Sequence, residues 1–307
     1  MLKAAILDDY QGVATRLADW SAIAKDVEIK VFDKPFASQA EAVQALQGFA
    51  IVAGMRERTP FPRAVIEALP DLKLLITTGA KNNSFDVKAA AERGVTVCGT
   101  GSAGNPTVGI VFGLMLELTR HIGFENARMK AGEPWQTTIG LDLEGLTLGI
   151  VGLGKLGQRV ATIGKAFGMK VIAWSQNLTP EKAKEAGVGY ASREDLFAQA
   201  DFVSIHYQLS DRSRGLITAA DLGRMKKTAY LINTARAPIV DQAALLKALQ
   251  EKKIGGAVDH PYRKLDNVVL TPHLGYVSEQ NYRQYFPDIV ECIRAFLDGK
   301  PVRVIAP

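Results

Sequence analysis

The sequence has few cysteines and no cluster of positive charge. Its only two cysteines, Cys98 and Cys292, are far apart along the 307 residues, which predicts neither a disulfide framework nor a metal site. We interpret them as packed thiols in a reducing compartment and expect a cytoplasmic protein. The net charge of +5 comes from scattered lysines and arginines. A nucleic-acid partner, which needs a basic stripe, is therefore not expected.

The sequence also lacks an apolar run of membrane-spanning length. The longest apolar stretch, 107–118, is far shorter than the roughly 20 residues that a bilayer requires. Asp8 and Asp9 interrupt the N-terminal apolar stretch too early for a signal peptide. We expect no contact with a membrane. The composition, 47% apolar and 22% charged, is typical of a globular protein long enough for two cores.

The most informative stretch is LTLGIVGLGKLG at Leu146–Gly157. A predicted strand, a tight glycine turn and a helical pattern follow one another, as a dinucleotide-binding fingerprint requires. Gly152 permits the turn, Gly154 lets the backbone approach a pyrophosphate, and Gly157 brings the helix close to the strand. A purely structural glycine turn is the alternative, and the flanking strand and helix disfavour it. The predicted cofactor loop comprises Gly152, Leu153, Gly154, Lys155, Leu156 and Gly157.

Strand and helix patterns alternate twice along the chain, which predicts two parallel sheets with helices on both faces. The fold class is α/β, with two doubly wound parallel-sheet (Rossmann-like) domains flanking a cleft. Strands are predicted first at 2–7, 27–32, 50–53, 72–77 and 95–97, and later at 148–151, 170–174, 202–205, 229–233, 256–258 and 268–270.

Two helices are candidates for crossings between the domains. One begins at Pro106 and runs to about Lys130, and the other covers 278–297. If the second helix returns to the first domain, that domain is discontinuous. We therefore predict a substrate domain of residues 1–100 and 276–307, and a dinucleotide-binding domain of residues 101–275.

Three segments follow predicted strands of the second domain and carry candidate binding groups. The first holds Ser175 and Gln176 where an NAD-selective site has a carboxylate, so we expect use of both NADP and NAD with a lean to NADP. In the second, Arg236 can capture a carboxylate, although a solvated arginine is the commoner role for such a residue. In the third, His273 is a candidate acid or base. His206 ends a further strand, where it could touch the cofactor.

These motifs resemble the D-isomer-specific 2-hydroxyacid dehydrogenases over nearly the whole chain. The resemblance implies an NAD(P)-dependent oxidoreductase that reduces a small 2-oxo acid to a D-2-hydroxy acid, or the reverse, and a homodimer built with the apolar helix at 108–118. It implies that Arg236 binds the substrate carboxylate and 2-oxo group, that His273 is the acid/base, and that Asp259 and Thr234 contact the cofactor. The implied substrate loop is Gly79, Ala80, Lys81 and Asn82.

Three departures from the family pattern stand out. Asp259 is followed directly by His260-Pro261-Tyr262, so by comparison with the family a stretch of about ten residues is missing, with the Glu-Pro that would orient His273. The gap is either a true deletion or a loop that this sequence does not include. Ala237 stands where a glycine is expected, and Gly109 stands where a glutamate is common. The alternative to an enzyme is a dinucleotide-binding sensor or interaction protein without turnover. Because Arg236 and His273 both remain, the enzyme is the favoured interpretation.

Overall fold

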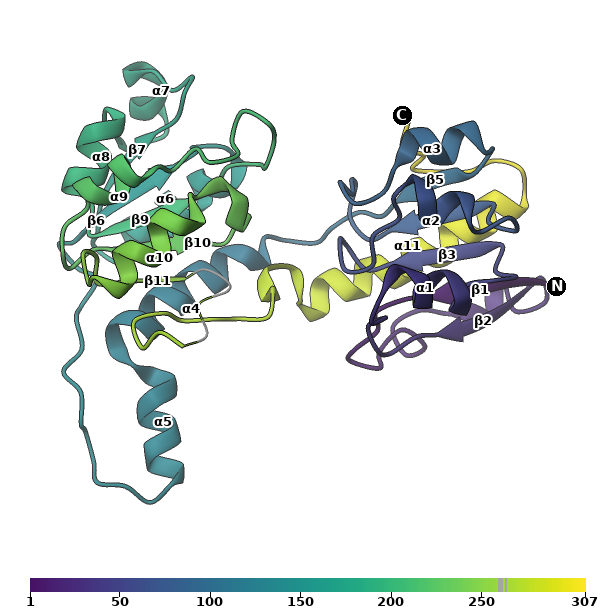
Figure 1. Cartoon of the computed structure of the whole chain (residues 1–307), viewed down its shortest axis with the longest axis horizontal. Coiled ribbons are helices and arrows are strands. Elements are labelled where there is room, and N and C mark those ends of the chain that lie inside the picture. Colours follow the sequence, from purple (N-terminus) through teal and green to yellow (C-terminus); the bar gives the residue numbers. More distant parts are fainter. Residues whose placement is uncertain (259–261, 263) are drawn as a thin grey trace. The chain divides into compact units, whose positions relative to one another are not determined.

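A computed structural model describes residues 1–258, 262 and 264–307. The chain forms two compact units (Figure 1). Unit 1 comprises Met1–Gly104 and Val277–Pro307, and unit 2 comprises Asn105–Tyr276. Unit 2 is thus inserted into unit 1. The predicted domain bounds differ from these unit bounds by a few residues.

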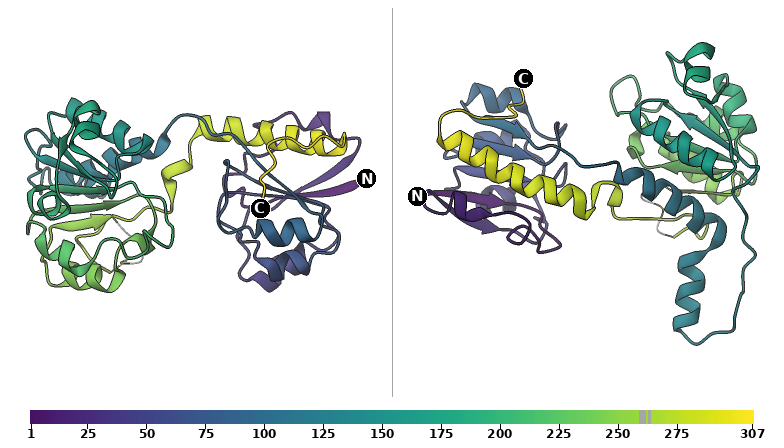
Figure 2. Two further views of the ribbon diagram at one scale, coloured as in Figure 1. Left: turned by 90° about the horizontal axis from the view of Figure 1, so that it is seen from above. Right: turned by 180° about the vertical axis from the view of Figure 1, so that it is seen from behind.

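Unit 1 contains a five-stranded parallel sheet in the order β2-β1-β3-β4-β5, which is a doubly wound arrangement. Its central strands are continuous buried apolar runs, as expected for a sheet covered on both faces. Figure 2 shows α11 on one face of the sheet and α2 and α3 on the other. The elements are β1 (Leu2–Ile6), η1 (Trp20–Ala22), β2 (Val27–Val31), α1 (Gln39–Ala45), β3 (Ile51–Gly54), α2 (Arg63–Glu67), β4 (Leu74–Thr77), α3 (Val87–Glu92), β5 (Thr96–Gly99) and α11 (Glu279–Leu297).

Helix α11 is fixed to unit 1 by polar as well as apolar contacts. The side chain of Ser278 caps its first turn, and its Asp288 carboxylate accepts a hydrogen bond of 2.7 Å from the backbone N–H of Gly101. Cys292 on α11 and Cys98 on β5 are free, fully buried thiols. A hydrogen bond between these thiols, together with burial, raises the pKa of Cys98.

Unit 2 contains a six-stranded parallel sheet in the order β11-β10-β9-β6-β7-β8. This is the strand order of a Rossmann dinucleotide-binding fold, which reverses direction between β6 and β9. The two doubly wound sheets confirm the predicted fold class. The elements are α4 (Pro106–Arg120), α5 (Ile122–Lys130), β6 (Thr147–Val151), α6 (Lys155–Ala166), β7 (Lys170–Trp174), α7 (Pro180–Glu185), β8 (Gly189–Tyr190), α8 (Arg193–Gln199), β9 (Phe202–Ile205), α9 (Ala219–Arg224), β10 (Tyr230–Asn233), η2 (Ala237–Ile239), α10 (Gln242–Gln250), β11 (Gly256–Val258) and η3 (Leu274–Tyr276).

Each face of the unit 2 sheet has its own hydrophobic core. On one face, Val111 and Met115 of α4 and Val160 of α6 pack against β6 and β7. On the other, apolar side chains of α8, α9 and α10 pack together against β9 and β10. This double cover holds the carboxyl ends of the strands at one edge, where the candidate site lies.

The predicted helix over 106–130 is wrong in one respect, because it is two helices. His121 adopts the left-handed conformation at φ 52° and ends α4, and α5 leaves at an angle of 65°. The helical burial pattern stops at Thr119, and no residue of α5 is buried, so no packing holds the two segments in line. Among the described residues, no single helix is long and apolar enough to cross a membrane; only this bent pair reaches that length and composition jointly.

The predicted strand at 268–270 is also wrong. Only Val268 forms a β-bridge, to Ala257, and the segment is otherwise irregular. Strand β11 pairs along all three residues with β10 on its other side, whereas at this edge only Ala257 exchanges backbone hydrogen bonds, with Asn267 and Val269 at 3.1 Å each.

Candidate functional site

The glycine turn after β6 requires two of its glycines for distinct reasons. Gly152 has φ +99°, and a Cβ there would lie 2.9 Å from the Tyr207 ring and 3.0 Å from the His206 carbonyl oxygen. A Cβ on Gly157 would overlap the Gly152 carbonyl oxygen. These contacts keep α6 close to β6, as a dinucleotide turn demands.

The N-terminus of α6 is suited to an anion. The helix begins at Lys155 with Gly154 as its N-cap, and its first turn carries no acidic side chain. Gly154 is exposed, and the space where its Cβ would stand is open. The free N–H groups and the positive end of the helix dipole are therefore accessible to a phosphate.

Two buried polar atoms at the same edge of the sheet lack partners within the described part of the chain. They are Nδ1 of His206, after β9, and Oγ1 of Thr234, after β10. The other ring nitrogen of His206 lies 2.9 Å from the Ser204 hydroxyl, and burial lowers the pKa of His206 to about 4, so its ring is neutral near pH 7. Buried polar groups normally have partners, so both atoms fit contacts to a bound ligand. With the open glycine turn, they fit a dinucleotide.

The segment after β7 forms a turn in which the Leu178 N–H donates to the Ser175 carbonyl at 3.0 Å. Ser175 is partly exposed and Gln176 is exposed. The backbone N–H of Gln176 donates to the Tyr207 hydroxyl at 3.0 Å. Tyr207 was missed by the sequence analysis; its position directly after a strand-end histidine was the available signal.

Arg236 lies in the loop that follows β10, beyond Thr234. The Asn233 side chain braces this loop, because it accepts from the Ala235 N–H at 3.1 Å and donates to the Arg236 carbonyl at 3.2 Å. Ala237 is the first residue of a short 3-10 helix and does not have a positive φ. The loop therefore tolerates alanine at the position where the family pattern has glycine.

His273 lies just before η3. Its backbone has φ +55°, its side chain is exposed, and its ring packs edge-on against Tyr276 with 5.4 Å between ring centroids. The Thr107 hydroxyl donates to the Gly275 carbonyl at 2.8 Å and ties this segment to α4. Asp259, the third residue implied by the resemblance, lies outside the described residues.

The predicted substrate loop, Gly79–Asn82, lies in unit 1 after β4. Gly79 and Asn82 are buried, whereas Ala80 and Lys81 are exposed. The Asn82 amide donates to the Arg56 carbonyl at 2.6 Å, and the Arg56 guanidinium occupies the space where a Gly79 Cβ would stand. Arg56 was not among the residues predicted from the sequence, although it lies just past the end of a predicted strand.

The structure therefore gathers most of the candidates at one edge of the unit 2 sheet. The glycine turn, Ser175, His206, Thr234 and Arg236 all follow the carboxyl ends of neighbouring strands. His273 belongs to the same unit, and the Gly79–Asn82 loop belongs to the other. No group of three or more His, Cys, Asp or Glu side chains in the described ranges is placed to hold a metal ion.

A Rossmann strand order, a glycine turn and an open helix N-terminus define a dinucleotide-binding protein. Residues 112–275 match the model of the D-isomer specific 2-hydroxyacid dehydrogenase NAD-binding domain. The chain belongs to this family of oxidoreductases, with NAD or NADP as cofactor.

Known relatives match at several lengths. The chain is 35% identical over 256 residues to a glyoxylate reductase of Aeropyrum pernix, and this match covers 77% of the chain and 76% of that protein. It is 33% identical over 280 residues to a D-3-phosphoglycerate dehydrogenase of Synechocystis, which covers 87% of the chain but 50% of that protein. A phosphoglycerate oxidoreductase of Vibrio cholerae has a TM-score of 0.91 at 33% identity, over 97% of this chain and 100% of that one.

Proposed function

We propose that the protein reduces a small 2-oxo acid to a D-2-hydroxy acid, with the cofactor bound by unit 2 and with Arg236 and the Gly79–Asn82 loop as substrate-binding residues. One observation carries the proposal. A guanidinium, Arg236, stands in a braced loop at the same sheet edge as an open dinucleotide turn. Glyoxylate, the substrate named for the Aeropyrum relative, and hydroxypyruvate are the first substrates to try.

In this proposal the dihydronicotinamide, when bound, supplies the hydride. Arg236 holds the substrate carboxylate in a bidentate pair and stabilises the negative charge that develops on the 2-oxo oxygen. His273 delivers a proton to that oxygen. The positive φ of His273 supports a functional role, because strained backbone conformations concentrate at active sites.

The Glu-Pro stretch that follows Asp259 in the family pattern is absent from this sequence, so the glutamate that would orient His273 does not come from that segment.

Substitution of the two proposed catalytic residues tests the function. Arg236→Ala is expected to lower kcat/KM for glyoxylate by about 100-fold or more, since it removes a charge-assisted pair and transition-state stabilisation together. His273→Gln is expected to lower chiefly kcat, while cofactor binding, followed by fluorescence titration, persists. Arg224→Ala, an exposed arginine on α9, is the control. Parent-like kinetics in both variants would refute the assignment.

We also propose a homodimer. The apolar side chains of 108–118, which were expected to form its interface, are mostly buried in the core of unit 2, Val111 and Met115 among them. The interface that we propose is instead the arm, which we define as residues 121–141. Six of the twelve exposed large apolar side chains in the described residues lie in this arm, among them Trp135 at 77% and Ile139 at 98% exposure. Figures 1 and 2 show α5 and the following loop standing away from the rest of unit 2. A second copy of the chain would cover this apolar surface.

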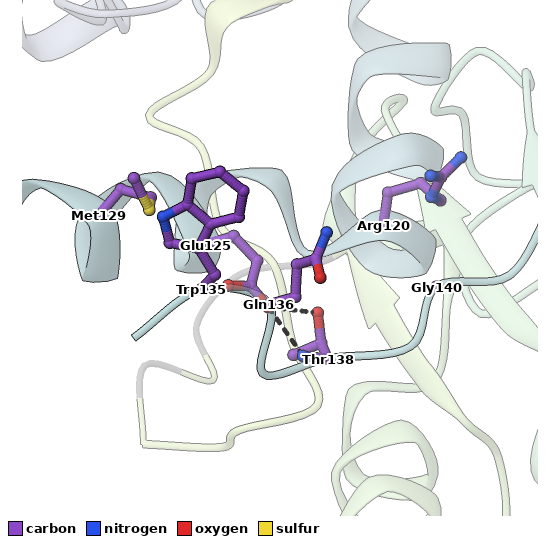
Figure 3. A pocket seen from close by; sticks show the side chains of 7 residues that line it. All are labelled: Arg120, Glu125, Met129, Trp135, Gln136, Thr138 and Gly140. Atoms are coloured by element: carbon purple, nitrogen blue, oxygen red, sulfur yellow. Dashed lines mark hydrogen bonds between the residues drawn. The ribbon is translucent and has the colours of Figure 1, made fainter. Parts of the chain in front are cut away.

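Hydrogen bonds give the arm a defined conformation. The Glu125 carboxylate accepts hydrogen bonds from both the backbone and the side chain of Thr138, at 2.8 and 2.7 Å, which folds the loop back on α5 (Figure 3). Trp135, Met129 and Arg120 line a pocket of about 400 Å³ beside this clamp. Because the arm has a defined conformation and a pocket, it can form a shape-complementary interface with a specific partner surface.

The cytoplasmic location stays a proposal, supported by the two free thiols of unit 1.

A further inference from the structure

Tyr207 connects two parts of the cofactor site. It follows His206 after β9, and its ring lies against Gly152 at the glycine turn, where a Cβ would come within 2.9 Å of it. Its hydroxyl accepts the hydrogen bond from the Gln176 N–H. Because β6 lies between β9 and β7 in the sheet, the side chain crosses the end of β6 to reach the segment after β7.

The surroundings of Tyr207 hold its ring in place. Its ring centroid lies 6.5 Å from that of Trp174, and the Arg193 guanidinium lies over the Trp174 ring at 5.3 Å. Arg193 is fixed in turn by an ion pair of 2.6 Å with Asp221, whose carboxylate is buried. The Tyr207 hydroxyl therefore has a fixed position, because the aromatic ring that carries it is packed against its neighbours.

The donor and acceptor groups of the Tyr207 phenol determine which hydrogen bonds it can make to a ligand. A phenol has one proton to donate and an oxygen that accepts. The oxygen is engaged by Gln176, which leaves the proton for an acceptor in the space beside Ser175 and Gln176. That space receives the ribose 2′ substituent of a dinucleotide in this type of fold.

The two nicotinamide cofactors differ at this substituent. A 2′-phosphate carries up to two negative charges and only accepts hydrogen bonds when fully ionised, whereas a 2′-hydroxyl both donates and accepts. A hydrogen bond from a neutral donor to a charged acceptor is stronger than one to a neutral acceptor. A lone O–H donor therefore favours the phosphate.

We propose that Tyr207 determines cofactor specificity: its hydroxyl accepts the Gln176 N–H and donates to the 2′-phosphate of NADP. The inference rests on the proposed function, because it assumes that unit 2 binds a nicotinamide dinucleotide. It adds a residue to the site and names the chemical group, a ribose 2′-phosphate, that this residue recognises.

Fragments of the cofactor test the proposal without turnover. Isothermal titration measures the binding of adenosine 2′,5′-bisphosphate and of 5′-AMP to the parent, to Tyr207→Phe and to the control Tyr190→Phe, which alters an exposed tyrosine on β8. The parent is expected to bind the bisphosphate more tightly. Tyr207→Phe, which keeps the ring, is expected to weaken bisphosphate binding about 10-fold and AMP binding less than about 2-fold, the scale of one hydrogen bond to a charged group. Tyr190→Phe should change neither affinity.

Three results would overturn the proposal: equal weakening of both fragments, which indicates a merely structural role; no change in bisphosphate affinity; or a parent that binds both fragments equally. Circular dichroism of Tyr207→Phe verifies that the variant is folded. Failure of the proposed function looks different, because the parent would then show no turnover of 2-oxo acids while the fragments still discriminate at Tyr207.

Discussion

At the scale of single residues, cofactor choice depends on the short turn after β7. Ser175 offers a hydroxyl where NAD-selective sites place a carboxylate, and Gln176 adds an exposed amide side chain. No arginine lies in the turn to pair with a phosphate, and the nearby Lys155 is exposed on the first turn of α6. These features favour use of both cofactors with a modest lean to NADP.

The variant Ser175→Asp is expected to reverse that lean. A carboxylate at this point accepts hydrogen bonds from the ribose hydroxyls and repels a 2′-phosphate, an effect of about 1 kcal/mol or more at a partly exposed site. The comparison of kcat/KM for NADH and NADPH on the parent and the variant measures it, with the uncharged isostere Ser175→Asn as control. A parent that prefers NADH by about 100-fold, equivalent to ~2.8 kcal/mol, would contradict our interpretation of Ser175.

At the scale of elements, the pattern of apolar residues predicted those strands and turns whose residue types are fixed by burial. The buried runs of β1, β3, β6 and β9 and the turn at Gly152 follow directly from the sequence, because a covered parallel strand must be apolar. The break at His121 and the loss of a strand at 268–270 could not be predicted, since each depends on whether a neighbouring element supplies packing or ladder partners. The roles of Tyr207 and Arg56 depend on contacts between segments far apart in sequence, which spacing does not reveal.

The end of α10 shows a local conflict between residue type and conformation. Lys252 follows the helix with φ +51°, and its N–H donates to the Leu249 carbonyl at 3.1 Å. This left-handed closing position favours glycine, because a Cβ is disfavoured there.

Lys252→Gly is therefore expected to stabilise unit 2 by about 1 kcal/mol. Scanning calorimetry measures the effect. The unfolding transition that shifts when NADPH is added is assigned to unit 2, because unit 2 binds the cofactor. The matched substitution Lys247→Gly, inside α10, is expected to destabilise by about 1 kcal/mol. Equal effects of the two substitutions would show that the backbone at Lys252 is unstrained.

At the scale of the whole molecule, the arm should decide the oligomeric state. Light scattering of the parent is expected to give twice the chain mass of 33.2 kDa at micromolar concentration. Trp135→Glu combined with Ile139→Glu introduces charges into the proposed interface, and the mass should fall to that of one chain. Tyr190→Glu, an exposed apolar position outside the arm, serves as control. A parent of single-chain mass would refute the dimer, and a variant that stays dimeric would place the interface elsewhere.

The insertion of unit 2 into unit 1 has a consequence for synthesis on the ribosome. All of Asn105–Tyr276 leaves the exit tunnel before α11, the helix that covers one face of the unit 1 sheet. Unit 2 can therefore complete its core while Met1–Gly104 still exposes an apolar sheet face. During that interval the nascent chain offers a binding surface to chaperones, and a pause in translation before α11 emerges from the tunnel would prolong it.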